Sequence, residues 1–307
     1  MASFVISCGL NFSYMGILLI CILFNAYIGI VFKYFKIYDI RNLQAIVINY
    51  FVCALTASFV MGKPAITTEN LHQEWFPYAL GLGLLFISTF YVFAFTVQKI
   101  GVVISAIFQK MSLIAPTIVA ILYFNESANP LKIIGIFLAI LAIVTISYSK
   151  KKDGENILEG GFAVWIFPLG TFLGSCMIDL GLFYVNAKDI ASSTDIDFIA
   201  SLFFISGCFG LIGVIYEYFK HKVTIRTKDI IAGFALGIPN FFSIYFLLKT
   251  LQIGLDGSVV FPINNVGILI ITALYGIFIF KEKVNRQKLI GFVMAITSIV
   301  LISQGNE

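Results

Sequence analysis

Charged side chains are scarce in this sequence. Asp, Glu, Lys and Arg make up 12% of the 307 residues, whereas 60% are apolar and the mean hydropathy is +0.98. A water-soluble domain of this size has no place for so much apolar surface, because its outer face must be solvated. The scarcity of charge therefore excludes an ordinary soluble fold and predicts an integral membrane protein that contacts the lipid bilayer.

Histidine is almost absent, and cysteine follows no ligand spacing. The two histidines, His72 and His221, fall in separate loops, and the five cysteines lie in or beside apolar runs without a C-x-x-C pair. Motifs such as H-E-x-x-H or a paired Ser and His therefore have no source in this chain. We expect no enzyme activity, no metal site, no cofactor and no nucleic-acid partner.

Apolar runs of the length that crosses a bilayer follow one another along the whole chain. A hydrocarbon core about 30 Å thick requires about 20 apolar residues per helix. Residues 1–12 hold no Lys or Arg, so the basic start of a cleaved signal peptide is missing and we expect the first helix to stay. The predicted fold is all-α, with ten transmembrane helices near residues 13–32, 42–62, 75–97, 101–123, 131–149, 161–185, 196–219, 229–249, 257–280 and 288–304.

One ten-residue frame occurs twice. "ESANPLKIIG" at 126–135 and "EKVNRQKLIG" at 282–291 both read E-x-x-N-x-x-K-x-I-G, and each follows the fourth helix of a five-helix block. Because five is odd, the second block must cross the membrane in the opposite sense to the first. We therefore predict two inverted repeats, residues 1–152 and 153–307, an arrangement typical of secondary transporters.

Small residues recur in the helix that follows each copy of the frame. Such spacing lets two membrane helices approach closely, so it predicts a packing seam. The residues are Gly135, Ala139 and Ala142 in the first half and Gly291, Ala295 and Ser298 in the second. The acidic residues that open the frames, Glu126 and Glu282, are interpreted as interfacial groups or helix caps.

The predicted chain has ten helices in two such halves, and in each half an acidic residue follows the fourth helix and a glycine begins the fifth. This pattern resembles that of the drug/metabolite transporter superfamily, in particular its EamA-type members. The stretch "LFNAYIGIVFK" offers Asn25 and Lys33 where that family often has a polar residue and a lysine in its first helix. The resemblance implies export or exchange of small metabolites, amino acids or drugs through a cavity between the halves.

Charges inside the predicted helices mark a candidate substrate site. Lys110 lies near the middle of the fourth helix and Asp179 lies well inside the sixth, and such charges are costly unless they are paired or functional. Asn25, Asn264 and Asn265 fall at matching depths. We expect Lys110 to bind a carboxylate, Asp179 an ammonium group, and the three amides the remaining polar edges of a substrate.

Structural interpretations of the same residues stay open. Lys110 and Asp179 could neutralise each other, and the asparagines could join helices by hydrogen bonds. A stripe on the fourth helix is interpreted as a packing seam, and it consists of Ser105, Gln109, Ser112, Pro116 and Ala120.

The resulting functional prediction is a secondary transporter of a small polar metabolite, an amino acid or similar zwitterion, that works by alternating access as an exporter or a proton-coupled antiporter. Asp179 is the predicted proton carrier, because an aspartate in low dielectric takes up a proton readily unless Lys110 keeps it ionised. The alternatives are an exporter of lipophilic cations and a membrane channel or sensor. The oligomeric state stays open.

The basic residues of the loops predict an orientation. Fifteen of the twenty Lys and Arg residues lie in or beside the loops that follow odd-numbered helices. The positive-inside rule places those loops in the cytoplasm and both termini outside, whereas the family resemblance implies the opposite. The predicted location is the plasma (inner) membrane.

Overall fold

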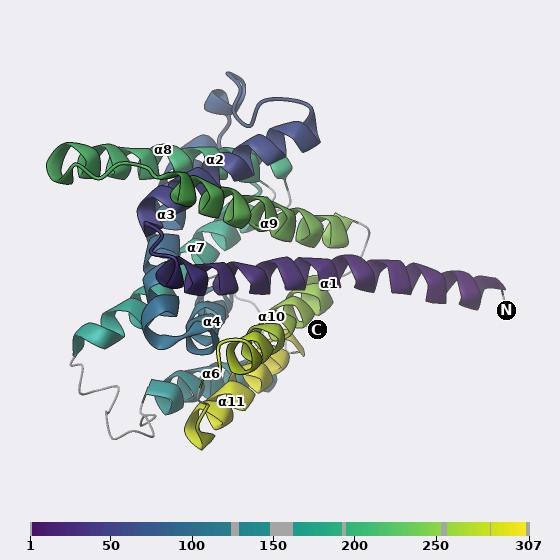
Figure 1. Cartoon of the computed structure of the whole chain (residues 1–307). Coiled ribbons are helices and arrows are strands. Elements are labelled where there is room, and N and C mark those ends of the chain that lie inside the picture. The colour runs from purple at the N-terminus through teal and green to yellow at the C-terminus, as the bar shows by residue number, and fades with distance from the viewer. Residues whose placement is uncertain are drawn as a thin grey trace.

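The computed structural model describes residues 2–123, 129–147, 162–191, 195–252, 257–282 and 284–304. Within these ranges the chain forms helices joined by short turns, and no strand occurs (Figure 1). The α-helices are α1 (Ala2–Ile37), α2 (Asn42–Met61), α3 (Phe76–Ile100), α4 (Val102–Lys110), α5 (Ile114–Leu122), α6 (Pro130–Ser147), α7 (Phe162–Ala187), α8 (Ile196–His221), α9 (Thr227–Gln252), α10 (Gly257–Phe278) and α11 (Arg286–Gln304). Short 3-10 helices add Asn70–His72 (η1) and Met111–Leu113 (η2).

Each predicted transmembrane range contains helix in the structure. By length and hydropathy, seven of the described helical segments are able to cross a bilayer, and Pro130–Thr145 and Ile263–Phe278 are shorter apolar helices. The all-helical membrane class is therefore confirmed, while the count of ten complete spans stays a prediction.

The fourth predicted helix, 101–123, is not one regular helix. It consists of α4, the 3-10 turn η2 and α5. Pro116 explains the interruption, because a proline has no N–H for the carbonyl four residues earlier, at Ser112, and its ring crowds that carbonyl. Only Gly101 separates α4 from α3, and its φ of 98° is a conformation that residues with a side chain avoid.

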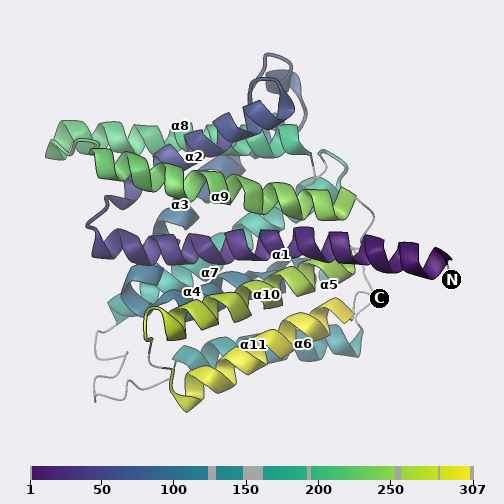
Figure 2. The ribbon, with the colours of Figure 1, turned by 45° about the vertical axis from the view of Figure 1, so that its right-hand side comes forward.

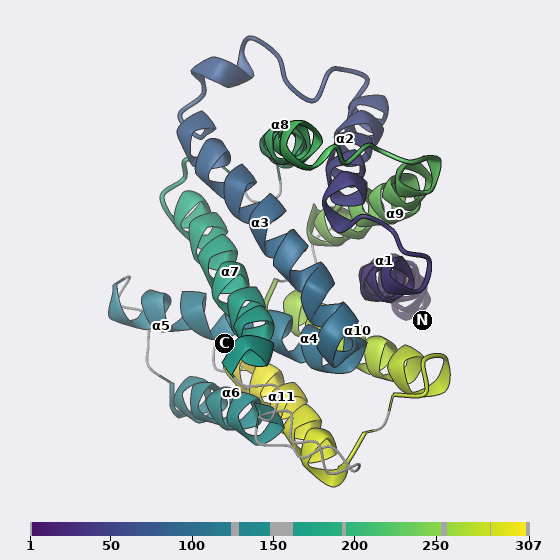
Figure 3. The same cartoon turned by 60° about the vertical axis from the view of Figure 1, so that its left-hand side comes forward.

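The helices form two bundles that mix the two halves of the sequence. One buried apolar cluster joins α1, α2, α3, α8 and α9, and we call this set the larger bundle. A second cluster joins α4, α10, the start of α5, α6 and α11, and we call this set the smaller bundle. In Figure 3, α1, α2, α8 and α9 lie above the helices of the smaller bundle, and α7 runs down beside α3 from one group toward the other. The helix α7 contributes residues to both clusters.

The predicted small-residue seam is where α6 packs on α11, and these helices lie side by side in Figure 2. Ala142, Ala295 and Ser298 are fully buried there. A methyl group on Gly135 would come within 2.7 Å of the Ile302 side chain, so only glycine permits this approach. The seam prediction is therefore confirmed.

The helix ends on one side of the molecule carry most of the described basic residues, and we call it the basic side. It holds the α1–α2, α8–α9 and α10–α11 turns, whereas α1 begins and α11 ends on the opposite side, which we call the terminal side (Figure 2). Arg226 and Lys228 bind the Asp39 carboxylate at 2.9 and 3.0 Å, and Arg226 also pairs with the buried Asp229. These contacts fix the α1–α2 turn to the α8–α9 turn.

Candidate functional site

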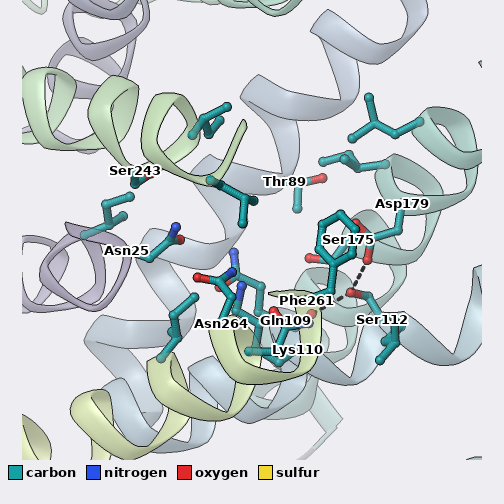
Figure 4. Close-up of a pocket in the computed structure, with 18 of the residues that line it drawn as sticks. Asn25, Thr89, Gln109, Lys110, Ser112, Ser175, Asp179, Ser243, Phe261 and Asn264 are labelled. Atoms are coloured by element: carbon teal, nitrogen blue, oxygen red, sulfur yellow. Dashed lines mark hydrogen bonds between the residues drawn. The ribbon is translucent and has the colours of Figure 1, made fainter. Parts of the chain in front are cut away.

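A cavity of about 880 Å³ lies between the two bundles, and Figure 4 shows many of its lining residues. Its walls come from all the α-helices except α11, and they combine phenylalanine rings with a small set of polar side chains. All five predicted site residues line it: Asn25, Lys110, Asp179, Asn264 and Asn265. The fold thus brings together side chains from α1, α4, α7 and α10.

Lys110 is the last residue of α4 and directly precedes the 3-10 turn. The interruption ends the regular helix at mid-depth, where non-helical backbone is tolerated in a membrane protein only beside protein or a wet cavity. Among the described residues, no hydrogen bond or ion pair engages the Lys110 ammonium. A cationic group in this position is available to an anionic group of a ligand.

Asp179 lies on α7 and accepts a hydrogen bond from the Ser112 hydroxyl of the 3-10 turn (Figure 4). Ser112 also lies 2.7 Å from the Gln109 carbonyl oxygen, so its hydroxyl has two acceptors within reach. Although Lys110 is close enough for its charge to influence the Asp179 carboxylate, the two described side chains form no ion pair. The neutralising pair considered from the sequence is absent from this state of the protein.

The amides occupy the wall opposite α7, and they differ in burial. Asn264 is 4% exposed and its side-chain oxygen lies 3.3 Å from the Cys21 sulfur, which joins α10 to α1. Asn25 and Asn265 are only partly buried and face the cavity. Asn264 therefore lines the cavity and also connects α10 to α1, which supports the interpretation that this asparagine joins two helices by a hydrogen bond.

Other polar lining residues were missed from the sequence. Gln109, Ser112 and Pro116 belong to the stripe interpreted as a packing seam, and this interpretation is wrong for these three because the interrupted helix turns them toward the cavity. Ser105 of the same stripe is fully buried, and the Ala120 side chain lies outside the described residues. Lys132, the lysine of the first repeated frame, also lines the cavity. The remaining ones are ordinary polar residues in apolar helices as far as the sequence shows: Thr89, Thr117, Ser175, Asn186, Asn240, Ser243 and Thr272.

The two ends of the cavity differ in exposure. Toward the terminal side the lining includes Asn186, which is exposed. Toward the basic side it ends at Gly29, Val102 and Thr272, and all three are buried. The structure is therefore closed at the basic side, and the lining reaches exposed surface on the other.

Glu282 is a helix cap, but not of the helix that follows it. Its carboxylate accepts the N–H of Val102 at 2.9 Å and caps the start of α4, which lies in the other half of the chain. The family-pattern lysine Lys33 pairs with it at 3.1 Å. Glu126, the corresponding residue of the first half, lies outside the described residues.

These features define a helical multi-pass membrane protein with a polar cavity between two bundles. The comparisons with known proteins refine that class: residues 168–304 match the model of the EamA-like transporter family, which consists of transporters rather than enzymes. The resemblance to the drug/metabolite transporter superfamily, predicted from the sequence, is thereby confirmed. The matched residues, which make up most of the second half of the chain, thus resemble a membrane transporter.

Two further relatives resemble almost the whole chain. An uncharacterized protein of Haemophilus influenzae is 29% identical over 288 residues, which are 92% of this chain and 95% of the relative. A solved crystal structure of a protein superposes with a TM-score of 0.60 at 13% identity, and the match covers 94% of this chain and 96% of that one. At this identity the superposition shows a shared fold.

Proposed function

We propose that this protein is a secondary transporter that carries a small zwitterion, such as an amino acid, through the cavity by alternating access. The observation that carries the proposal is that Lys110 and Asp179 line one cavity without forming an ion pair with each other. A zwitterion offers a partner to each charge, because its carboxylate binds Lys110 and its ammonium group binds Asp179. Asn25, Asn264 and Asn265 bind the remaining polar edges.

The proposed architecture is ten spans in two inverted repeats, residues 1–152 and 153–307. Helix packing supports it: α1 packs on α9 as α7 packs on α3, and α2 on α9 as α8 on α3. The pairs α2 with α8, α4 with α10, and α6 with α11 are each made of corresponding helices. Exchange of the two halves would leave this set of contacts unchanged, as a twofold inverted repeat requires.

Asp179 is the proposed proton carrier. The Ser112 hydroxyl donates a hydrogen bond to this carboxylate in the present structure. A carboxylate in low dielectric that loses such a partner during the transport cycle takes up a proton more readily. The protein then acts as an exporter or antiporter that is driven by the proton gradient. Asp179→Asn, which mimics the protonated state, should keep substrate counterflow in proteoliposomes and lose accumulation driven by a pH gradient. Gradient-driven accumulation that survives in this variant would end the coupling proposal.

A second candidate is an exporter of lipophilic cations, and the phenylalanine content of the cavity favours it. The rings that line the cavity are Phe86, Phe90, Phe93, Phe183, Phe203 and Phe261. A planar or quaternary cation binds such rings through its charge and its apolar surface, with Asp179 as the counter-ion.

Ligand screening separates the two candidates. The purified protein should be stabilised against heat by amino acids if it carries zwitterions, and stabilisation by quaternary ammonium compounds alone would favour the second candidate. Stoichiometric exchange of the stabilising compound in proteoliposomes would then distinguish a carrier from a channel or sensor.

We further propose the plasma (inner) membrane as the location, with both termini outside, from the concentration of basic residues on one side. Exposed positions on the two sides provide the test, namely Leu71 on the terminal side and Arg286 on the basic side. An impermeant thiol reagent applied to intact cells should label Leu71→Cys, and labelling of Arg286→Cys instead would reverse the orientation.

A further inference from the structure

The carboxylate of Glu282 joins three groups from two other parts of the chain. It lies 3.1 Å from the Lys33 ammonium near the end of α1, 2.9 Å from the backbone nitrogen of Val102 and 3.5 Å from that of Val103. The backbone N–H groups at a helix start have no partner within the helix, so a carboxylate is well suited to this place. Hydrogen bonds to charged groups are also stronger than those between neutral groups.

The local backbone is shaped around this carboxylate. A methyl group added to Gly101 would come within 2.6 Å of a Glu282 carboxylate oxygen, and one added to Gly276 within 3.2 Å. The backbone N–H of Glu282 donates to the Gly276 carbonyl at 2.9 Å, which folds the chain after α10 back toward α4. Two glycines therefore leave the space that the carboxylate occupies.

The contact crosses between the bundles. Lys33 extends from α1 of the larger bundle, whereas Glu282 follows α10 of the smaller bundle. The start of α4 contacts both bundles, because Val102 packs in the apolar cluster of the larger bundle and Val103 in that of the smaller one. The other ion pairs recorded among the described residues connect parts of the larger bundle, such as Lys63 with Asp197 and Arg226 with Asp39. Within the part of the chain that the structure describes, the Lys33–Glu282 pair alone joins the two bundles by opposite charges.

The contact also lies directly behind the closed end of the cavity. The Val102 side chain lines that end, and a methyl group on Gly29 of α1 would lie 3.0 Å from it, so α1 and α4 touch there. The same Val102 donates its backbone N–H to Glu282. Val102, which lines the closed end of the cavity, and Glu282, which pairs with Lys33 of α1, are thus in direct contact.

We propose that Glu282 is a latch that holds the cavity closed on the basic side. To open this side, its carboxylate must leave Lys33, and the α1–α4 contact at Gly29 and Val102 must separate. The strength of the latch therefore sets the balance between the state seen here and the state open to the basic side. The latch rests on the proposed transport function, for which it is a positioning device that does not touch the substrate.

The test measures the distance between the bundles and requires no substrate. Spin labels on Ile37→Cys, in the larger bundle, and Arg286→Cys, in the smaller bundle, lie on the basic side at exposed positions outside the latch. In Glu282→Gln the population with a longer distance should rise about tenfold relative to the parent protein, as expected for the loss of one charge-assisted contact. Lys33→Gln, which leaves the α4 cap in place, should shift the same population by a smaller factor.

Asp197→Asn is the matched control, because it breaks the 2.7 Å pair with Lys63 within the larger bundle. The inter-bundle distances should not change in this variant. If Glu282→Gln does not fold in detergent, Lys33→Gln decides alone. Parent-like distance distributions in the folded latch variants would overturn the proposal.

The outcomes separate the latch from the transport function. If Glu282→Gln shows the longer inter-bundle distances but the protein exchanges no compound in proteoliposomes, the latch proposal stands and the transporter proposal is wrong. If the protein exchanges a substrate but the inter-bundle distances are the same in the parent and in the latch variants, only the latch proposal is wrong.

Discussion

The segment from α4 to α5 and the helix α10 hold corresponding places in the sequence repeat and pack against each other, yet they are built differently. The first is interrupted by a 3-10 turn, whereas α10 is continuous. Phe108 is fully buried, while its counterpart Phe261 is 44% exposed and lines the cavity. The interrupted segment contributes a lysine, and the continuous helix contributes amides. The two copies of the repeat thus occupy corresponding places in the fold, but they contribute different kinds of side chain to the cavity.

Among the changes to these two segments, we expect removal of Lys110 to have the largest effect on transport. Lys110→Ala deletes the unpaired cation of the interrupted segment, so the substrate carboxylate loses a charge-assisted contact of about 3 kcal/mol, about 100-fold in the transport rate at low substrate concentration. Exchange in proteoliposomes measures the effect. Lys249→Ala, at the end of α9, is the control and should retain transport; parent-like exchange by Lys110→Ala would assign Lys110 a structural role.

Pro116→Ala should make the two segments more alike. With a backbone donor restored and the ring removed, α4 and α5 can join into one helix, which should raise thermal stability and turn Lys110 away from its present direction. We expect uptake to fall about tenfold, the change that corresponds to about 1.4 kcal/mol. Pro168→Ala in the continuous α7 is the control. Unchanged uptake with a higher melting temperature would show that the interruption is not needed for transport.

The amides of the continuous helix should contribute less than the lysine. Asn264→Ala removes one neutral hydrogen-bonding group from the wall, worth about 1 kcal/mol, so we expect the KM to rise about fivefold with little change in kcat. The Asn265→Ala variant should behave similarly if both amides bind the substrate. Thr297→Ala, at an exposed position of α11 where the hydroxyl bonds its own helix, provides the control. If neither Asn264→Ala nor Asn265→Ala changes the KM, the side chains that bind the substrate would be those of α4 and α7 alone.

The smallest effect is expected outside the two compared segments. Lys228, and next Arg226, hold the pKa of the exposed Asp39 below its usual value. Because this pKa is lower in the folded protein, Asp39 stabilises the fold above its unfolded pKa, and that stabilisation is lost as the pH falls through the lowered value. Asp39→Asn should slightly reduce the difference in melting temperature between pH 7 and pH 3 and leave transport unchanged. A pH dependence identical to that of the parent would show that the contact does not contribute.

The sequence was sufficient for some features, and the reason is physical. Hydropathy predicts membrane helices because the bilayer dictates their length, and small residues at regular spacing predict the α6–α11 seam because nothing larger fits. The polar residues Lys110 and Asp179 could be found because charges are rare at such depths. That they line one cavity agrees with their predicted common site, and their binding role stays a prediction.

Other features depend on contacts that the sequence does not encode locally. Pro168 and Pro239 lie within continuous helices, whereas Pro116 lies just after the 3-10 turn that separates α4 from α5. The presence of a proline alone therefore does not predict whether a helix is interrupted. The partner of Glu282 is a helix start 180 residues earlier, and no local pattern connects the two. Asp179 likewise bonds Ser112 rather than Lys110, a choice made by the packing of α7 on the turn.

The single residue between α3 and α4 has a consequence for the synthesis of this protein. A lysine at the centre of a helix costs about 2.5 to 3.5 kcal/mol when that helix enters the bilayer from the translocon. The α4 segment carries Lys110, but it is joined through Gly101 alone to α3, whose only charged residue is Lys99, next to its last residue. With no loop between them, the two segments must enter the bilayer together as a hairpin, and α3 supplies the apolar surface that offsets the cost. The lysine of the cavity is thus brought into the membrane by its neighbour before the cavity exists.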